Sequence, residues 1–275
     1  MTAHPHTSTP MPAIQALSMN PIIFSQVPAL DTALSKLSSF IDEQSTWADS
    51  AAQSRASVKG VMSSNVLPYL KSRFQPPAQP PKTLPSATPA ILSSWTQASS
   101  AIVAELPVES LFPLVDLWRL ALLDPAVGTW IVSLPPNVSS QDPINIFLPK
   151  AIGAHDLSGS KGARNYILTV LRFLCNAFSS SALSHKLLRD SKARNQISVV
   201  LIPSLLHSDA LVRTASASLA FNIAAVLQKD RVESVRLGRG IPVDSEDYLA
   251  DWEVETVSAL LEALDREKEN EEVGA

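Results

Sequence analysis

The sequence predicts an all-α fold from about residue 90 onward, and three features of the chain support this prediction. Apolar residues make up 45% of the 275 residues but aromatic residues only 6%, so the core is expected to be aliphatic, which suits packed helices. From about residue 90, apolar residues recur at helical spacing. No run of four to eight residues alternates β-branched and polar side chains between turn signals, so a sheet is not expected.

The first 89 residues are expected to be largely irregular. Residues 1–20 mix proline, threonine and serine without periodicity, which is typical of a disordered leader. Residues 21–89 are predicted to be a linker that starts extended and contains short amphipathic helices, the clearest of them over Leu30–Ile41. Six prolines lie between Gln75 and Pro89, and this density favours a polyproline-II spacer.

Residues 90–275 are predicted to form one helical domain. The segment 165–178 is apolar almost all round, which indicates a helix buried between layers. Asp-Pro and Leu-Pro-Pro sequences are interpreted as gaps between helices, because proline interrupts helical hydrogen bonding. Helices are expected over residues 91–106, 108–123, 165–178, 184–190, 195–206, 210–227 and 251–269.

An internal repeat indicates how these helices are arranged. Asn222 follows Asn176 by 46 residues (222 minus 176), inside the ~40–47 residues of armadillo and HEAT repeats. The sequences around them, LRFLCNAF and LAFNIAAV, are similar, and we therefore expect an armadillo- or HEAT-like right-handed α-solenoid. Each asparagine either binds the backbone of an extended peptide or satisfies a neighbouring turn, and the residues alone favour neither role.

Four segments resemble the PUL domain, the armadillo-like module of the phospholipase-A2-activating protein and its fungal ubiquitin-fusion-degradation counterpart. They are LFPLVDLWRLALLDP, NYILTVLRFLCNAFSS, VRTASASLAFNIAA and VSALLEALDREKENEE, in the family's order across about residues 90–270. The resemblance implies a non-catalytic adaptor in ubiquitin-dependent protein degradation. Its groove would bind the C-terminal tail of the valosin-containing AAA+ segregase, with ubiquitin-pathway factors as further partners.

The end of the sequence departs from this family pattern. In the family another apolar helix follows the fourth segment, whereas this sequence stops at Ala275. The last repeat is therefore expected to be incomplete, with Leu260, Leu261 and Leu264 exposed.

The charge distribution suggests where a partner binds. Residues 155–215 contain eight lysines and arginines against three aspartates, whereas residues 244–275 contain twelve acidic residues against two basic ones. Arginine forks suit peptide carboxylates, although Arg213 could instead pair with Asp209, and Lys186 to Arg194 could form a solvated face. The predicted partner-binding groove consists of Arg172, Asn176, Lys186, Arg189, Lys192, Arg194, Arg213 and Asn222.

A weaker resemblance offers an alternative function. The stretch MNPIIFSQVPALDTALSKLSSFID is similar to the segment that follows the thioredoxin-like domain in fungal proteins joining a PPPDE-type isopeptidase, a thioredoxin fold and a PUL domain. This implies that the chain is the C-terminal part of a thiol isopeptidase whose catalytic half is encoded upstream.

No catalytic, metal or cofactor site is predicted. The single cysteine, Cys175, falls in the most apolar predicted helix, so core packing is favoured over a nucleophilic role. The sequence GSKG at 159–162 lacks the Lys-Ser/Thr of a phosphate-binding loop and is predicted to be a flexible hinge. His4 and His6 lack a third metal ligand.

Composition also disfavours several partners and compartments. Aromatic residues do not interleave with the basic ones and the net charge is −4, which argues against nucleic-acid binding. The longest apolar runs fall short of the ~20 residues of a membrane span. With one cysteine and no signal-peptide pattern, a reducing compartment is expected, either the cytosol or the nucleus.

Overall fold

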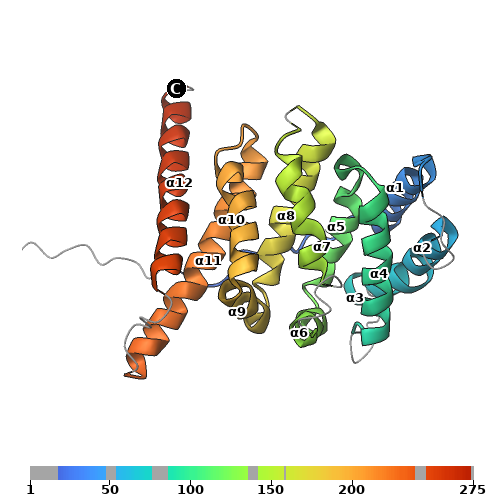
Figure 1. Ribbon diagram of the computed structural model, residues 1–275, viewed down its shortest axis with the longest axis horizontal. Helices are drawn as coiled ribbons and strands as arrows, with labels where there is room; N and C mark the ends of the chain where they lie inside the picture. The colour runs from blue at the N-terminus through green and yellow to red at the C-terminus, as the bar shows by residue number, and fades with distance from the viewer. Residues whose placement is uncertain are drawn as a thin grey trace, which may run out of the picture.

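The computed structural model describes residues 18–47, 54–75, 86–135, 142–157, 159–238 and 246–273, and all regular structure in these ranges is helical. The helices stand side by side in one elongated array, from α1–α4 at one end to α12 at the other (Figure 1). The prediction of an all-α solenoid is confirmed. In chain order the elements are α1 (Leu30–Glu43), α2 (Arg55–Val61), η1 (Met62–Val66), α3 (Leu67–Phe74), α4 (Pro89–Glu105), η2 (Val108–Ser110), α5 (Phe112–Ala121), α6 (Pro125–Ser133), α7 (Pro143–Ala154), α8 (Lys161–Ala177), α9 (Ser181–Arg189), α10 (Ser191–Leu205), α11 (Ala210–Arg236) and α12 (Glu246–Val273).

The helices form two layers whose members recur every third element. Helices α5, α8 and α11 contact one another in order, and so do α4, α7, α10 and α12. The short helices α6 and α9 contact each other and introduce the repeats that contain α7–α8 and α10–α11. This three-helix unit of one short and two long helices is the armadillo arrangement that the 46-residue offset predicts.

Helix α8 lies at the centre of the array and packs on both layers. Residues on every side of it are buried, as its nearly continuous apolar sequence predicts. The rings of Phe147 and Phe173 meet edge to face with centroids 5.7 Å apart. Tyr166 places its hydroxyl 2.9 Å from the carbonyl oxygen of Phe147, so the one polar atom of this buried ring is satisfied.

Two Asp-Pro sequences lie between helices and also begin the helix that follows. The carboxylate of Asp124 accepts a hydrogen bond from the Ala126 N–H at 3.1 Å, and that of Asp142 accepts one from Ile144 at 2.9 Å. Proline follows each aspartate at the first helical position, where it needs no hydrogen-bond partner. These sequences do mark gaps between helices, but the prediction missed α6 and α7, the helices that begin there.

The N-terminal helices belong to the solenoid core, which corrects the prediction of a linker over residues 21–89. Leu37 and Ile41 of α1 are buried, and α1 contacts α5. In α3, Tyr69 donates a hydrogen bond to the buried carboxylate of Asp124 at 2.9 Å. Helices α1 to α3 thus cover the end of the array; the predicted leader at 1–17 and most of the proline-rich stretch, 76–85, lie outside the described residues.

The GSKG sequence, predicted to be a flexible hinge, supplies the N-cap and the first two residues of α8. Ser160 caps the helix by accepting a hydrogen bond from Ala163 at 3.2 Å. Gly162, in the first turn, lies directly against the 3₁₀ turn η2. A Cβ atom added there would lie only 2.8 Å from the carbonyl oxygen of Glu109 and 2.9 Å from its Cα.

Gly162→Ala is expected to lower the free energy of unfolding by about 2 kcal/mol, because backbone has to move to admit the methyl group. Denaturant unfolding followed by circular dichroism measures the change. Gly153→Ala in α7 is the matched control, since nothing lies within 4 Å of its added Cβ. Alanine should stabilise that position by about 0.5–1 kcal/mol, and equal losses at the two sites would contradict the predicted clash.

Candidate partner-binding face

A non-helical segment, residues 21–28, crosses the layer of α11, α8 and α5 and is held there by side chains from each helix. The Ile22 N–H donates to Asn222 Oδ1 at 2.6 Å, and Asn222 Nδ2 donates to the Ile22 carbonyl at 2.8 Å. Asn176 repeats the pattern at Phe24, with distances of 2.7 and 3.0 Å. Each asparagine therefore pairs with both polar groups of one backbone residue.

A third helix extends this row of contacts. Arg119 of α5 donates hydrogen bonds to the carbonyl oxygens of Phe24 and Gln26, the latter at 2.9 Å. Asp116, one turn earlier, holds the guanidinium at 2.6 Å. We call Arg119, Asn176 and Asn222 the backbone ladder. They bind residues 22, 24 and 26, and the segment runs from α11 towards α5, opposite to the order of the repeats.

The asparagines also bind the solenoid itself. Both are fully buried, and Asn176 Nδ2 also donates to the carbonyl oxygen of Arg119 at 2.9 Å. Asn222 Nδ2 makes a longer contact, 3.4 Å, with the carbonyl oxygen of Cys175. Of the two roles open from the sequence, the asparagines bind an extended backbone, and this backbone belongs to the same chain.

Arg172 lies on the same face without an acidic partner. Its guanidinium is 5.2 Å from the centroid of the Phe24 ring, and its buried Nε atom has no hydrogen-bond acceptor. No carboxylate of the described residues forms an ion pair with it. Burial, together with the positive charge of Arg119, lowers the pKa of this guanidinium. Arg172 is therefore a partly desolvated cation beside the ladder.

Comparison with models of known protein families identifies the family of this chain. The model of the PUL domain matches residues 18–274, nearly the complete chain. The chain belongs to the PUL domain family. The match includes the segment bound by the ladder and the helices α1 to α3. Searches of the curated proteins and of the solved structures found no match. A PUL domain is a non-catalytic protein-interaction module, so the partners that it implies are proteins.

Five of the residues predicted for the groove of this PUL domain lie elsewhere. Lys186 contacts α6 and α7, with its Nζ 2.7 Å from the carbonyl oxygen of Ile131 and 3.6 Å from Asp142. Arg194 is buried and donates to the carbonyl oxygen of Leu188 within its own repeat. Arg189 and Lys192 are exposed at the junction of α9 and α10.

The fifth, Arg213, forms an ion pair with Glu267 of α12 and donates hydrogen bonds to two carbonyl oxygens of the α10–α11 turn. The pairing with Asp209 considered from the sequence is absent, because Asp209 binds Arg164 at 2.7 Å. Arg213 thus ties the last helix to the array. Of the eight predicted residues, only Arg172, Asn176 and Asn222 share the ladder face.

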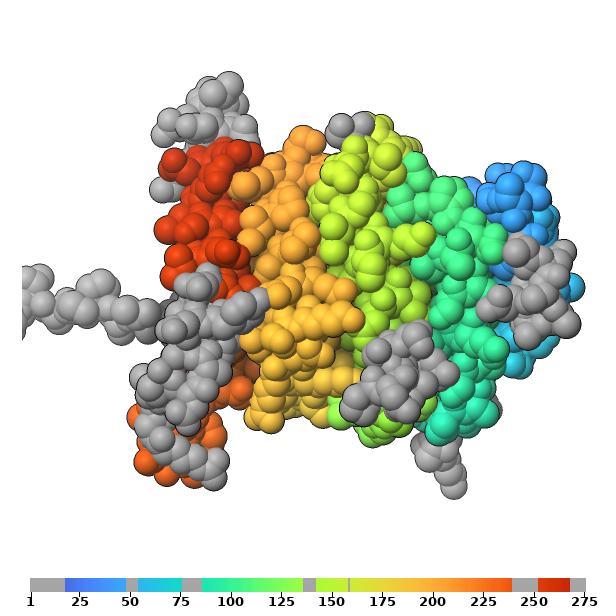
Figure 2. Space-filling view, viewed as in Figure 1, coloured from blue at the N-terminus to red at the C-terminus, as the bar shows by residue number. Residues whose placement is uncertain are grey.

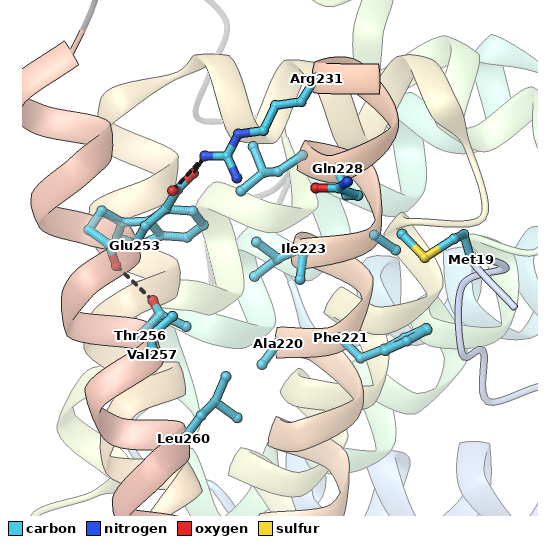
Figure 3. Close-up of a pocket in the computed structure, with 14 residues that line it drawn as sticks. Met19, Ala220, Phe221, Ile223, Gln228, Arg231, Glu253, Thr256, Val257 and Leu260 are labelled. Carbon is cyan, nitrogen blue, oxygen red and sulfur yellow. Dashed lines mark hydrogen bonds and ion pairs between the residues drawn. The ribbon is translucent and has the colours of Figure 1, made fainter. Parts of the chain in front are cut away.

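An apolar groove of about 360 Å3 separates the two last helices of the PUL domain (Figure 3). Ile223 and Leu260 line its walls, and an ion pair of 2.6 Å between Arg231 and Glu253 closes one end. Leu261 and Leu264 are 63% and 58% exposed on the outer side of α12, as expected for them. Leu260 instead packs against the core, which corrects the prediction for that residue.

The nucleophile considered from the sequence, Cys175, lies in the core of the array. Cys175 is buried, its Sγ lies 3.6 Å from the carbonyl oxygen of Ala215, and burial raises the pKa of the thiol, so core packing is its role. No group of three His, Cys, Asp or Glu side chains in the described part of the chain could hold a metal ion. His4 and His6 lie outside that part.

Among the described helices taken singly, α11 is long and apolar enough to cross a membrane. Half of its most apolar window is buried inside the array, as in the core helix of a soluble protein. Helices α8 and α9 would pass the same test together but are bent by 113°. The space-filling view shows the helices packed in one continuous body (Figure 2).

Acid is expected to destabilise the PUL domain through two histidines that line one cavity. Burial, and in second place the nearby His207, lowers the pKa of His155, and burial lowers that of His207. With folded pKa values below the ordinary ~6.5, the unfolded chain takes up protons first. The stability present at pH 7 should therefore fall as the pH drops through 6.5 towards 5.

Denaturant unfolding at pH 7, 6 and 5 measures this dependence. A double variant, His155→Gln with His207→Gln, should lose less stability across that range than the native chain. His185→Gln is the control, because this histidine lies outside the cavity and contacts Asp230 at 2.9 Å. Equal pH dependence in the native chain and the double variant would show that other groups are responsible.

Proposed function

We propose that this protein is an adaptor that binds the acidic C-terminal tail of the valosin-containing AAA+ segregase in ubiquitin-dependent protein degradation. The observation that carries the proposal is Arg172, which has no acidic partner among the described residues and lies beside a ladder suited to extended backbone. Its family makes the chain a protein-interaction module. The cytosol or nucleus, where such a segregase works, is the proposed location.

The charges around the ladder support an acidic ligand. Arg119 and Arg164 each form an ion pair with an aspartate, at 2.6 and 2.7 Å. Because their charges are neutralised, these two arginines should attract a further anion only weakly. Arg172 forms no ion pair with the described residues and lies where water is partly excluded. A carboxylate reaching its Nε would form a charge-assisted hydrogen bond and relieve an unsatisfied buried donor.

The direct test is the affinity of a fluorescent peptide with the segregase tail sequence for the purified chain, measured by anisotropy. Arg172→Glu is expected to weaken binding at least tenfold, since it replaces attraction by repulsion at a desolvated position. Arg189→Glu is the matched control, because this exposed arginine makes the same charge change away from the ladder face. Raising the salt concentration should weaken the native complex.

Two results would count against the proposal. One is the absence of measurable binding by the native chain. The other is an equal loss of affinity in the Arg172 and Arg189 variants, which would mean that the peptide responds only to net charge.

A further inference from the structure

The backbone ladder binds its segment almost independently of sequence. Five of its hydrogen bonds join the side chains of Asn222 and Asn176 to Ile22 and Phe24, and Arg119 to Gln26, and all of them use backbone atoms of the segment. The intervening Ile23 makes no hydrogen bond to the described residues, and the residue is 42% exposed. Any extended chain with free N–H groups at two alternate positions could make the same bonds.

The bound segment itself is weakly anchored by its side chains. No residue from 18 to 29 is buried, and only Phe24 and Val27 pack partly against the core. The ladder side chains, by contrast, are buried and are held by bonds to the solenoid. A segment held mainly by backbone hydrogen bonds can detach from such a preformed site while the rest of the domain stays folded.

The segment also leaves one binding group unused. Residues 18–29 carry no charged side chain, so the segment offers no carboxylate to Arg172. Phe24 covers one side of the guanidinium, yet the buried Nε remains without an acceptor. A ligand with an aromatic residue at the Phe24 position and a carboxylate nearby would keep the ring contact and add an ion pair.

We propose that residues 21–28 are a built-in ligand, and that an extended acidic segment of a partner protein displaces them and pairs with the same ladder. The incoming segment would run from α11 to α5, with non-proline residues at the positions of Ile22 and Phe24. This inference rests on the proposed function only for the location of the site. It adds that binding of the partner and of the built-in ligand exclude each other.

Hydrogen exchange of the native full chain tests whether the segment opens. The amides of Ile22 and Phe24 are expected to exchange at least a hundredfold faster than that of Phe173 in α8, in conditions where exchange reports opening equilibria. If all three amides exchange at the rate of global unfolding, the segment is a fixed part of the fold and the proposal is wrong.

A peptide supplied in trans tests whether the ladder is a receptor. A labelled peptide of residues 18–29 is added to the native chain and to a variant with Ile22→Pro and Phe24→Pro, which lacks both N–H donors. The variant should bind the peptide about ten- to a hundredfold more tightly, because its own segment competes less well. Ile23→Pro is the matched control, since the Ile23 N–H has no partner among the described residues, and it should behave as the native chain does.

The outcomes separate this inference from the proposed function. The built-in ligand is ruled out if the native chain and the double variant bind the peptide equally. It is also ruled out if the double variant melts cooperatively but does not bind the peptide. Both conclusions hold whether or not the segregase tail binds. Should the variant fail to fold, hydrogen exchange of the native chain decides. The labelled peptide of residues 18–29 should bind as described, and an unlabelled acidic peptide with an aromatic residue should compete with it. In that case the inference holds even where the segregase tail itself does not bind.

Discussion

Replacing Asp124 by alanine is expected to lower the free energy of unfolding by about 4 kcal/mol. This carboxylate is 1% exposed and accepts hydrogen bonds from the Tyr69 hydroxyl at 2.9 Å, the Ser86 hydroxyl at 3.0 Å, the Ala87 N–H at 3.0 Å and the Ala126 N–H at 3.1 Å. Removing it leaves these donors without their acceptor, and a hydrogen bond to a charged group contributes ~1.5–3 kcal/mol. The loss should therefore exceed that of an ordinary helix cap.

The position of Asp124 explains why so much depends on one side chain. It caps α6, binds α3 through Tyr69, and fixes the start of the segment that leads into α4. Arg73 of α3 adds a weaker ion pair at 3.9 Å. Without the carboxylate, α1 to α3 would lose their main polar attachment to the solenoid, so unfolding of the variant should begin at that end.

Denaturant unfolding measures this prediction, with Asp124→Asn and Asp156→Ala as companions. Asparagine keeps one acceptor oxygen and the cap, so it should lose about half as much stability as alanine. Asp156 is exposed, and its replacement should change the free energy of unfolding by less than about 0.5 kcal/mol. A loss at Asp124 no larger than that at Asp156 would contradict the role of the network.

Helices with a strong apolar period could be predicted from the sequence, whereas α6 and α7, which each begin after the aspartate of an Asp-Pro sequence, could not. The period of α8 and α11 located both to within a few residues at their first turns, because their buried faces are long and nearly uninterrupted. Helices α6 and α7 were missed because an Asp-Pro sequence occurs both after the end of a helix and at the start of one. It breaks a preceding helix, and equally it supplies the cap and first residue of a following one.

The sequence predicted part of the candidate site. It did not predict the bound segment, whose contacts with the asparagines join residues far apart in the chain. The 46-residue offset placed Asn176 and Asn222 on equivalent helices, but their ligand lies 152 and 200 residues away in sequence. No local pattern encodes that contact. Arg119 was missed because it is not an asparagine and lies 57 residues before Asn176, outside the 46-residue offset.

The basic block failed as a predictor because charge along the sequence is not charge on one face. Lys186 of α9 and Arg194 of α10 bind carbonyl oxygens of neighbouring helices, and Arg213 of α11 pairs with α12. Of the predicted basic residues, only Arg172 lies beside the ladder. A positive stretch that spans four helices distributes its side chains around the solenoid. The functional prediction therefore rests on fewer residues than the sequence suggested, and on a more specific geometry.

Asn176→Ala is expected to lower the free energy of unfolding by about 3 kcal/mol in the native chain. The side chain makes three hydrogen bonds, of which two go to Phe24 and one to the carbonyl oxygen of Arg119, and each contributes ~1 kcal/mol. Gln228→Ala is the control, because this exposed residue on α11 makes no hydrogen bond to the described residues. Its replacement should change the stability by less than about 0.5 kcal/mol.

The same substitution separates the two duties of Asn176 when it is repeated in the chain with Ile22→Pro and Phe24→Pro. With the segment released, only the bond to the Arg119 carbonyl remains, so the cost of Asn176→Ala should fall to about 1 kcal/mol. The difference of about 2 kcal/mol is the coupling free energy between Asn176 and the segment. A displacing peptide has to gain more than this free energy from its own contacts with Asn176. A cost that stays at about 3 kcal/mol in both backgrounds would mean that Asn176 serves the solenoid alone.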